Sequence, residues 1–407
     1  MRILVQKFGG TSLSNTEARE HAVRQVKRAL AQQYSVVVVV SAMGRSGDPY
    51  ATDTLLQWIR DNGGDLPNRE MDLLLHCGEL ISAATLCSVM RCDGIDAAVL
   101  TGGQAGIITN AAHGNAHITA MEPERIRALL EEGQVVIVTG FQGRTISGDI
   151  TTLGRGGSDT TATTLGVALQ AERVDIFTDV NGILTADPRI VNNAVPLERV
   201  SYNEICHMAQ NGAKVIHPRA VEIAMHGRIP VRVRSTFSDA PGTLVTIPNV
   251  ADAGTGHVSD RTITGIANVP NITQIQIAAP DGQYDLQLAV FKAMAKHQIS
   301  IDFINVNPSG VVYTVFDKEA DRALQVLDTL GYPARLVRGC AKVSIIGGGM
   351  AGVPGVMARI VEALTSSDIP ILQSADSHTT IWVLVQGGHM EASVRALHDQ
   401  FQLHLAG

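Results

Sequence analysis

The chain has 407 residues, of which 45% are hydrophobic and only 4% aromatic, with 39 glycines. This length predicts two or three domains, and the composition is typical of an α/β protein rather than a β-sandwich or a disordered chain. The net charge of −7, with both signs spread along the chain, argues against nucleic acid or an anionic membrane as a partner.

Targeting and redox features indicate a cytoplasmic protein. The five cysteines form no C-x-x-C pair, so we expect reduced thiols rather than disulfides or zinc ligands. A strand-like run begins at residue 3, which leaves no room for a signal peptide. We also expect no membrane span, since no apolar run approaches the roughly 20 residues that a bilayer requires.

The first 245 residues alternate short apolar runs with longer helical patterns. Five consecutive valines at 36–40 predict a strand buried on both faces, as in a parallel sheet. Each expected strand ends in a segment rich in glycine, serine or threonine, and open α/β sheets bind ligands at these carboxyl ends. The expected strands are 2–6, 35–40, 97–100, 135–139, 174–177 and 229–235, and the expected helices are 16–32, 54–62, 69–91, 122–132, 160–171 and 201–210.

Two features of the first half suit a charged ligand. Lys7 lies at the exit of the first strand, before Gly9 and Gly10, where it could contact a phosphate. The segment is not a Walker A loop, and an exposed lysine before a turn is the alternative. Glu79 follows a mid-helix glycine, Gly78. A glycine within a helix lowers the stability of the helix by about 1 kcal/mol relative to alanine, so its presence suggests that another segment approaches the helix closely there. Glu79 either is solvated or faces a cationic ligand.

The most distinctive stretch is Thr-Thr-Leu-Gly-Arg-Gly-Gly-Ser-Asp-Thr-Thr at 151–161. It runs from a strand end through a glycine-rich turn into a helix, and we expect Ser158 or Asp159 to cap that helix. A helix N-terminus attracts anions, and Arg155 adds a planar cation suited to carboxylate or phosphate. The alternative is a capped turn between a strand and a helix.

Two later segments suit a nucleotide. The strand at 174–177 is followed by Thr178, Asp179, Asp187 and Arg189, which are compatible with nucleotide and Mg²⁺ recognition. A hairpin with surface charges is the alternative. Lys214 follows a glycine after the helix at 201–210, and it could contact phosphate or ribose, whereas we expect His217 before Pro218 to be structural.

The C-terminal part contains a repeat. Residues 291–299 align with 361–369, and Val315 with Val385, at an offset of 70 residues, so two βαββαβ units are the simplest account. We place a linker at 246–262, the first unit at 263–338 and the second at 339–407. A G-x-G-x-x-G match at 347–352 lies in a unit too small for a Rossmann domain, so we do not expect NAD binding.

Together these motifs resemble aspartate kinase, a family of the amino acid kinase fold. The resemblance rests on 7–12, 40–44, 78–79, 152–159, 178–179, 187–189 and 212–214. It implies a three-layer α/β/α kinase domain at 1–245, followed by two ferredoxin-like ACT units. The implied reaction is the ATP- and Mg²⁺-dependent phosphorylation of the side-chain carboxylate of L-aspartate, the first step towards lysine, threonine and methionine.

The resemblance also implies roles for individual residues, with Mg²⁺ on phosphate oxygens and water rather than on side chains. Gly47 stands where the family usually has threonine, and Leu184 where an aromatic residue is usual. The catalytic residues would be Lys7, Asp159 and Lys214; the substrate contacts Ser41, Gly47, Glu79, Arg155 and Ser158; and the ATP contacts Lys7, Phe8, Gly9, Gly10, Thr178, Asp179, Leu184, Asp187, Arg189 and Lys214.

The regulatory half suggests an effector and a dimer. By the resemblance, lysine or threonine would bind the ACT units, and these units would join two subunits. The candidate effector pocket comprises Asp281, Gln283, Asp285, Asn305 and Asn307. Two other functions stay open: a kinase of the same fold for another acid, such as N-acetylglutamate or uridylate, and an amino-acid sensor with a degenerate kinase domain.

Overall fold

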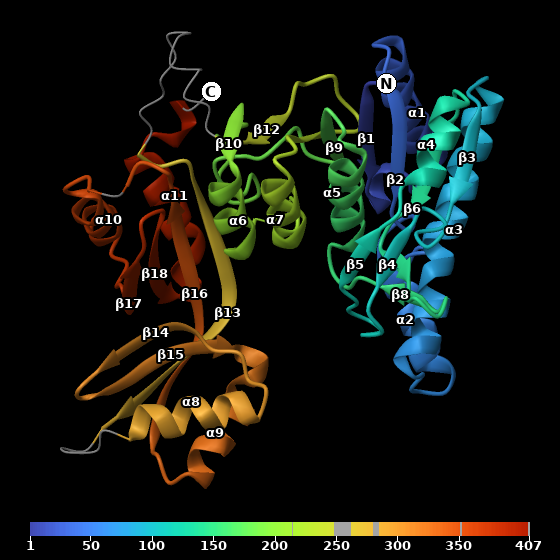
Figure 1. Ribbon diagram of the computed structural model, residues 1–407. Coiled ribbons are helices and arrows are strands. Elements are labelled where there is room, and N and C mark those ends of the chain that lie inside the picture. The colour runs from blue at the N-terminus through green and yellow to red at the C-terminus, as the bar shows by residue number, and fades with distance from the viewer. Residues whose placement is uncertain (214, 248–261, 280–284, 351, 406–407) are drawn as a thin grey trace.

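The computed structural model describes the chain except residues 214, 248–261, 280–284, 351 and 406–407. Figure 1 shows an N-terminal α/β domain and two smaller units that follow it in the sequence. The α/β domain ends with a strand at Thr243–Thr246, and most of the predicted linker lies outside the described residues.

The α/β domain is built on an eight-stranded sheet with the order β10-β12-β11-β9-β1-β2-β6-β3. Its neighbouring strands run parallel except for β11 and β12. The valines at 36–40 are all buried, as their pattern predicts. The strands are β1 (Ile3–Phe8), β2 (Ser35–Val40), β3 (Ala97–Leu100), β6 (Val135–Thr139), β9 (Arg173–Thr178), β10 (Arg199–Ser201), β11 (Val231–Ser235) and β12 (Thr243–Thr246).

Helices cover both faces of this sheet, which confirms the predicted three-layer sandwich (Figure 1). Helices α1 (Thr16–Ala31) and α3 (Asn68–Cys92) share one core with the sheet. A second core lies on the opposite face, and α2 (Thr52–Asn62) packs on α3. The helices of the second core are α4 (Glu124–Glu131), α5 (Gly157–Leu169), α6 (Tyr202–Gln210) and α7 (Pro218–Gly227).

Helix α3 is long and apolar enough to cross a membrane by length and composition alone, contrary to our expectation that no run approaches that limit. It packs, however, against α1, β3, β6 and β8. Two carboxyl side chains on it, Asp72 and Glu79, are buried inside the domain. We therefore interpret α3 as a core helix of the α/β domain.

A small second sheet, with the order β5-β4-β7-β8, lies beside α3. The sequence analysis predicted only the end of its last strand. The other strands were not predicted because they have three or four residues, too few for a periodic pattern. The strands are β4 (Ile107–Thr109), β5 (Ile118–Met121), β7 (Gln142–Arg144) and β8 (Ile150–Thr152).

The C-terminal elements form one six-stranded sheet, with the order β14-β15-β13-β16-β18-β17. The predicted repeat is present, because α8 and α10 begin at 286 and 356, and β15 and β18 at 310 and 380, each pair 70 residues apart. The elements are β13 (Gly265–Ala278), α8 (Leu286–Lys296), β14 (Asp302–Asn307), β15 (Gly310–Phe316), α9 (Asp317–Thr329), β16 (Ala334–Ile346), α10 (Val356–Thr365), β17 (Gln373–Asp376), β18 (Thr380–Gln386) and α11 (Met390–Gln400).

The two repeats are interleaved rather than consecutive. Residues 265–269 of β13 pair with 342–346, whereas residues 272–277 pair with 334–340. An irregularity separates the halves, and there Asn271 has a φ of 60°. The predicted boundary at 263 thus gave residues 265–269 to the first repeat, although they complete the sheet of the second. We call residues 272–338 unit 1, and residues 340–403 with 265–269 unit 2.

Candidate active site

The predicted ligand segments meet at one edge of the large sheet. Strand β1 lies between β2 and β9, and the chain continues in opposite directions across the sheet from this point. A crevice outside the carboxyl ends of such strands is the usual ligand site of an open α/β sheet. The segments that follow β1, β2, β6 and β9 therefore surround one site.

An ion pair lies at the centre of this edge. The Nζ atom of Lys7, at the end of β1, is 2.7 Å from Oδ1 of Asp159, in the first turn of α5. The side chains are only 13% and 12% exposed. The backbone N–H of His217 donates to Oδ2 of Asp159 (3.4 Å). Asp159 thus fixes the position of the Lys7 ammonium from the neighbouring helix.

The start of α5 differs from the prediction. The helix begins at Gly157, its N-cap is Gly156, and no side chain caps it, so neither Ser158 nor Asp159 is the cap. Gly156 has a φ of +69°, and a β-carbon there would lie 2.2 Å from the His217 ring. Only glycine satisfies both conditions. Without a side-chain cap, the positive end of the helix faces the site.

Glu79 is a buried carboxyl group beside this ion-pair edge. Its side chain reaches the segment after β2, where the N–H of Ala42 donates to Oε1 (3.1 Å). The residue is 2% exposed, and Oε2 has no hydrogen-bond partner among the described residues. Burial raises the pKa of Glu79 to about 8. At Gly78 a β-carbon would lie 2.9 Å from that of Ala42, so the predicted close approach is confirmed.

The segment after β2 connects the two sides of the crevice. Arg45 forms an ion pair of 2.7 Å with Asp179, which follows β9. Gly47 has a φ of +99°, so a threonine there would be strained. Its N–H donates to Oγ1 of Thr54 on α2 (3.0 Å). At Gly47, where the resemblance expects threonine, only backbone atoms can contact a substrate. Thr54 brings a hydroxyl group to the same loop.

The glycine-rich turn before α5 carries an exposed cation. Arg155 is exposed, and within the described part of the chain no hydrogen bond or ion pair holds its guanidinium group. Ser158 is buried in the first turn of α5, and Ser41, after β2, is half-buried. Ser41 directly precedes Ala42, whose N–H donates to Glu79, so Ser41 lies at the same edge as Glu79.

The segment after β9 lies on the other side of β1 from the segment after β2. Thr178 donates to Oδ1 of Asp179 (3.1 Å), and Asp187 forms an ion pair of 2.6 Å with Arg189. Leu184 is half-buried and forms a β-bridge with Pro196. Gly9 and Gly10 follow β1 directly. The Phe8 side chain is buried and stacks on Phe177 at 4.7 Å, so only its backbone can reach a ligand.

The structure does not place Lys214, and it does not show a complete effector pocket within the described residues. Lys214, Asp281 and Gln283 lie outside the described residues. Asp285, Asn305 and Asn307 are exposed. The start of α8 approaches the end of β14, because Gln287 Nε2 donates to the carbonyl oxygen of Asn307 (3.4 Å). The Asn307 side chain itself accepts from Ser309.

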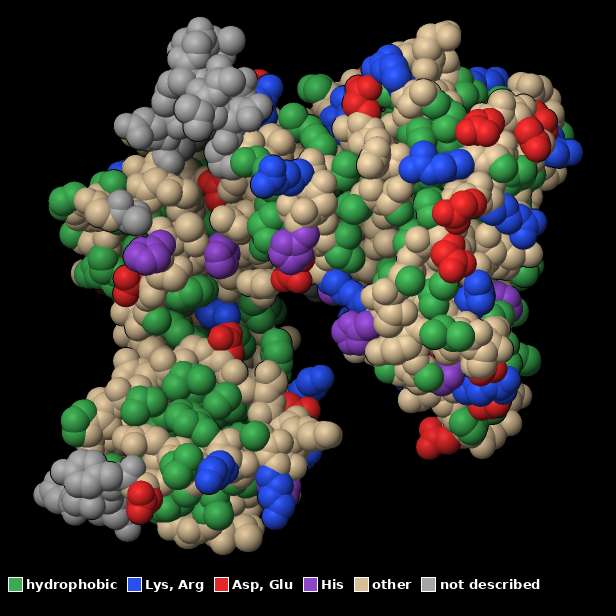
Figure 2. Space-filling view, in the orientation of Figure 1, with side chains coloured by type: hydrophobic (Ala, Val, Ile, Leu, Met, Phe, Trp, Pro, Cys, Tyr) green, Lys and Arg blue, Asp and Glu red, His purple; other side chains and the backbone are tan. Residues whose placement is uncertain are grey.

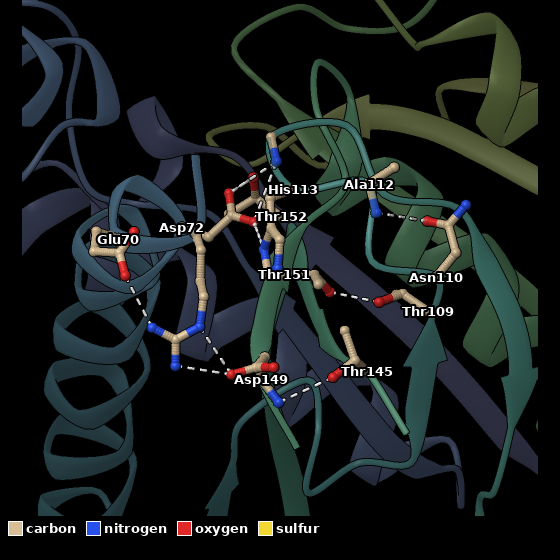
Figure 3. Close-up of polar contacts among 12 residues, drawn as sticks. Glu70, Asp72, Thr109, Asn110, Ala112, His113, Thr145, Asp149, Thr151 and Thr152 are labelled. Atoms are coloured by element: carbon tan, nitrogen blue, oxygen red, sulfur yellow. Dashed lines mark hydrogen bonds and ion pairs between the residues drawn. The ribbon is translucent and has the colours of Figure 1, made fainter. Parts of the chain in front are cut away.

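One positioning residue, Asp72, was missed by the sequence analysis. It is fully buried on α3 and accepts hydrogen bonds from Thr152 Oγ1 (2.5 Å) and the Gly114 N–H (3.1 Å), while His113 Nδ1 lies 2.9 Å away (Figure 3). Thr152 directly precedes the glycine-rich turn. Asp72 therefore anchors that turn to α3. The signal in the sequence was an acid directly before the apolar run Leu73–Leu75 of a helical stretch.

Unit 2 contacts helix α6 of the α/β domain. Asn211, at the end of α6, accepts hydrogen bonds from Ser344 Oγ on β16 and Trp382 Nε1 on β18, both at 3.0 Å. Glu204, near the start of the same helix, accepts from the Gly348 N–H (3.2 Å). Gly348, in the glycine-rich segment of the G-x-G-x-x-G match, therefore joins unit 2 to the α/β domain.

Comparison with known proteins identifies the family. The amino acid kinase family model matches residues 2–235, and an ACT domain model matches residues 335–399. Aspartokinase 1 of Bacillus subtilis (strain 168) is 54% identical over 403 residues, which cover 99% of this chain and 100% of that protein. Two crystal structures of E. coli aspartokinase III, both 26% identical, cover 98% of this chain and 99% of their own. The complex with aspartate and ADP (R-state) has a TM-score of 0.78, and the complex with lysine and aspartate (T-state) one of 0.72. The chain therefore belongs to the amino acid kinase family and, within it, to the aspartokinases, which makes it a nucleotide-dependent kinase with C-terminal ACT units.

Proposed function

We propose that this enzyme transfers the γ-phosphoryl group of ATP to the side-chain carboxylate of L-aspartate, giving ADP and 4-phospho-L-aspartate. The observation that carries the proposal is the Lys7–Asp159 ion pair at the sheet edge, next to the buried Glu79 carboxyl group with its unpartnered oxygen. The E. coli relative binds aspartate and ADP, which are the substrate and a product of this reaction.

We propose that the amino acid is held at both of its charged ends. Glu79 as a carboxylate would accept hydrogen bonds from the substrate ammonium, and Arg155 would bind a carboxylate with two parallel N–H groups. Ser41 and Ser158 would add hydrogen bonds, and Gly47 a backbone contact. An N-acylated amino acid has no ammonium group for Glu79, which disfavours N-acetylglutamate as the substrate.

The nucleotide would lie between β1 and the segment after β9. Lys7 would neutralise the transferring phosphate oxygens, Asp159 would hold that lysine, and Lys214 would contact the phosphates as a further cation. Mg²⁺ bound to the phosphates and water would neutralise further charge. The base and ribose would contact Leu184 and the other predicted ATP contacts, which are Phe8, Gly9, Gly10, Thr178, Asp179, Asp187 and Arg189.

The transfer itself would need no covalent enzyme intermediate and no general base. A side-chain carboxylate oxygen of aspartate would attack the γ-phosphorus while the bond to the β–γ bridging oxygen breaks, and ADP would leave. Positioning and charge neutralisation supply most of the catalysis in such a reaction. A fixed lysine and an uncapped helix N-terminus suit both tasks.

The test is to trap the acyl phosphate with hydroxylamine in the presence of Mg²⁺-ATP. We expect hydroxamate from L-aspartate and none from N-acetylglutamate, with no phosphorylation of uridylate in a parallel assay. Hydroxamate from N-acetylglutamate alone would assign the enzyme to another acid. Binding of lysine or threonine without turnover of any acid would favour the sensor function.

We also propose a cytoplasmic homodimer joined through the ACT units and inhibited by lysine or threonine. Hydrophobic side chains gather on unit 1 in Figure 2, and the exposed ones include Leu288, Ile304 and Val306. Two of them lie on β14, an edge strand of the sheet, where another chain can pair. Light scattering tests the dimer, and inhibition of turnover by each amino acid tests the effector. The E. coli relative binds lysine.

A further inference from the structure

Three potential metal ligands meet at the C-terminal end of unit 2, outside the kinase site. His398 and Asp399 lie near the end of α11, and His404 lies in the short turn Leu403–Leu405. One ring nitrogen of each histidine and one carboxylate oxygen of Asp399 lie within 4.8 Å of one another. Gln402, with a φ of 52°, reverses the chain between them, and the two imidazole centroids are 6.3 Å apart.

The histidines carry unsatisfied nitrogens that point to a ligand. His398 is fully buried, and its Nε2 forms a hydrogen bond of 3.0 Å with Oγ1 of Thr185. The Nδ1 atoms of His398 and His404 are both buried and, within the described residues, have no hydrogen-bond partner. Buried polar atoms are nearly always paired, so such a pair of orphaned nitrogens calls for an explanation. Asp399 is exposed, which leaves an entry path from solvent.

We propose that His398, Asp399 and His404 bind one divalent transition-metal ion, of which Zn²⁺ is the best fit. Zinc takes imidazole nitrogen and carboxylate oxygen in tetrahedral sites with one position left for water. Atoms no more than 4.8 Å apart lie within about 2.8 Å of a common centre, so shifts of less than about 1 Å per side chain reach bonding distance. The Thr185 contact orients the His398 ring and leaves Nδ1 as the ligand.

The position of this metal site suggests a structural task. Thr185 is buried between Leu184 and Asp187 in the sequence, two residues that we propose as nucleotide contacts. The same helix α11 makes a second contact there, because Arg395 Nη1 donates to the carbonyl oxygen of Ile190 (3.0 Å). A metal ion on His398 would therefore stabilise the contact between unit 2 and the segment that contains Thr185 and Ile190. The inference concerns binding and stability, and it does not depend on which acid the kinase phosphorylates.

The test uses the full-length protein, stripped of metal with a chelator and free of nucleotide. Co²⁺ is titrated by visible absorption as a probe of tetrahedral coordination, and Zn²⁺ affinity is measured by competition with a chromophoric chelator. We expect one tight equivalent per chain and a Tm that rises with Zn²⁺. Asp399→Asn and His404→Gln should each weaken binding at least tenfold, whereas His378→Gln, which alters an exposed histidine elsewhere in unit 2, should leave it unchanged.

Two results would overturn the proposal. One is a wild-type chain that binds no tight equivalent of Co²⁺ or Zn²⁺. The other is an Asp399→Asn variant that binds as the wild type does. Asp399 is exposed, so this variant serves as the deciding one if His404→Gln fails to fold, and the Tm of each metal-free variant reports that failure.

Discussion

The buried Glu79 carboxyl group predicts how the aspartate affinity depends on pH. Burial raises the pKa of Glu79 to about 8, so the free enzyme carries mainly the neutral form below that pH. The proposed contact with the substrate ammonium needs the carboxylate. Binding below pH 8 therefore includes the free energy of ionising Glu79, and this free energy grows as the pH falls.

The magnitude follows from the pKa. Each pH unit below about 8 weakens the apparent affinity about tenfold, or about 1.4 kcal/mol. The KM for aspartate should thus fall about tenfold between pH 6.5 and 7.5 and become constant above about pH 8.5. Glu79→Gln keeps an acceptor for the Ala42 N–H but has no charge. Because a hydrogen bond to a charged group is worth about 1.5–3 kcal/mol, its KM should be about 10- to 150-fold higher at pH 8.5 and independent of pH.

Steady-state kinetics at saturating Mg²⁺-ATP, with ADP release coupled to NADH oxidation, measure both effects. The matched control is Glu70→Gln, on the same helix but with a 42% exposed carboxylate, which should retain the wild-type profile. A second readout is stability, since a raised folded-state pKa lowers the free energy of unfolding as the pH rises from 4.5 towards 8. Glu79→Gln should lack this decline. A KM that stays constant from pH 6.5 to 8.5 in the wild type would refute the reasoning.

Three further substitutions separate the roles of the remaining side chains. Asp159→Asn should lower kcat about 10²-fold or more without lowering the Tm, because Lys7 loses the partner that fixes it; an unchanged kcat would remove this ion pair from the mechanism. Arg155→Lys should raise the KM for aspartate but not that for ATP, since a point charge cannot replace a bidentate fork; equal changes in both constants would contradict that assignment. Asp72→Ala should lower the free energy of unfolding by about 3 kcal/mol, because Thr152 and the Gly114 N–H are left unpaired, whereas Asp149→Ala, at a surface ion pair with Arg69, should leave the midpoint of urea unfolding nearly unchanged.

The sequence predicts those parts of the fold in which a pattern extends over many residues. The valine run of β2 reveals a sheet buried on both faces, and the offset of 70 residues between Val315 and Val385 reveals the repeat. The carboxyl ends of parallel strands converge wherever the helices lie, so Lys7 and the segments that follow β2 and β9 can be expected at one edge of the sheet. Asp159 and Glu79 lie on helices, and their contacts with Lys7 and the Ala42 N–H are seen only in the structure.

Other features depend on contacts between distant segments, which leave no local pattern. Residues 265–269 belong to unit 2 because β13 is long enough to continue past Asn271 into a second sheet half. Ser158 and Asp159 look like helix caps, yet Gly156 takes that position because the His217 ring leaves no room for a side chain. The task of Asp72 depends on strand β8, which is too short to be predicted completely.

The contacts that hold the segments around the crevice in place predict how an effector acts. The glycine-rich turn, which carries the proposed substrate ligand Arg155, is held by α3 and the small sheet through Asp72 and Thr152. Unit 2 instead holds Asn211 through Trp382, and Asn211 precedes the proposed ATP contact Lys214 by three residues. An effector that shifts unit 2 should therefore change the KM for ATP more than the KM for aspartate. Trp382→Phe, which removes the indole N–H, should weaken this response while leaving uninhibited turnover within about twofold.

The measurement is to determine both KM values with and without the inhibiting amino acid, for the wild type and for Trp382→Phe. An inhibitor that raises only the KM for aspartate would show that the signal reaches α3 without passing through the segment near Asn211. A Trp382→Phe enzyme with an unchanged response would remove that hydrogen bond from the coupling. Coupling energies in such systems are typically about 1–3 kcal/mol, and a hydrogen bond to a side-chain amide contributes about 1 kcal/mol. Loss of this one contact is thus large enough to be seen, yet too small to abolish inhibition, so a partial loss is the outcome that supports the coupling through unit 2.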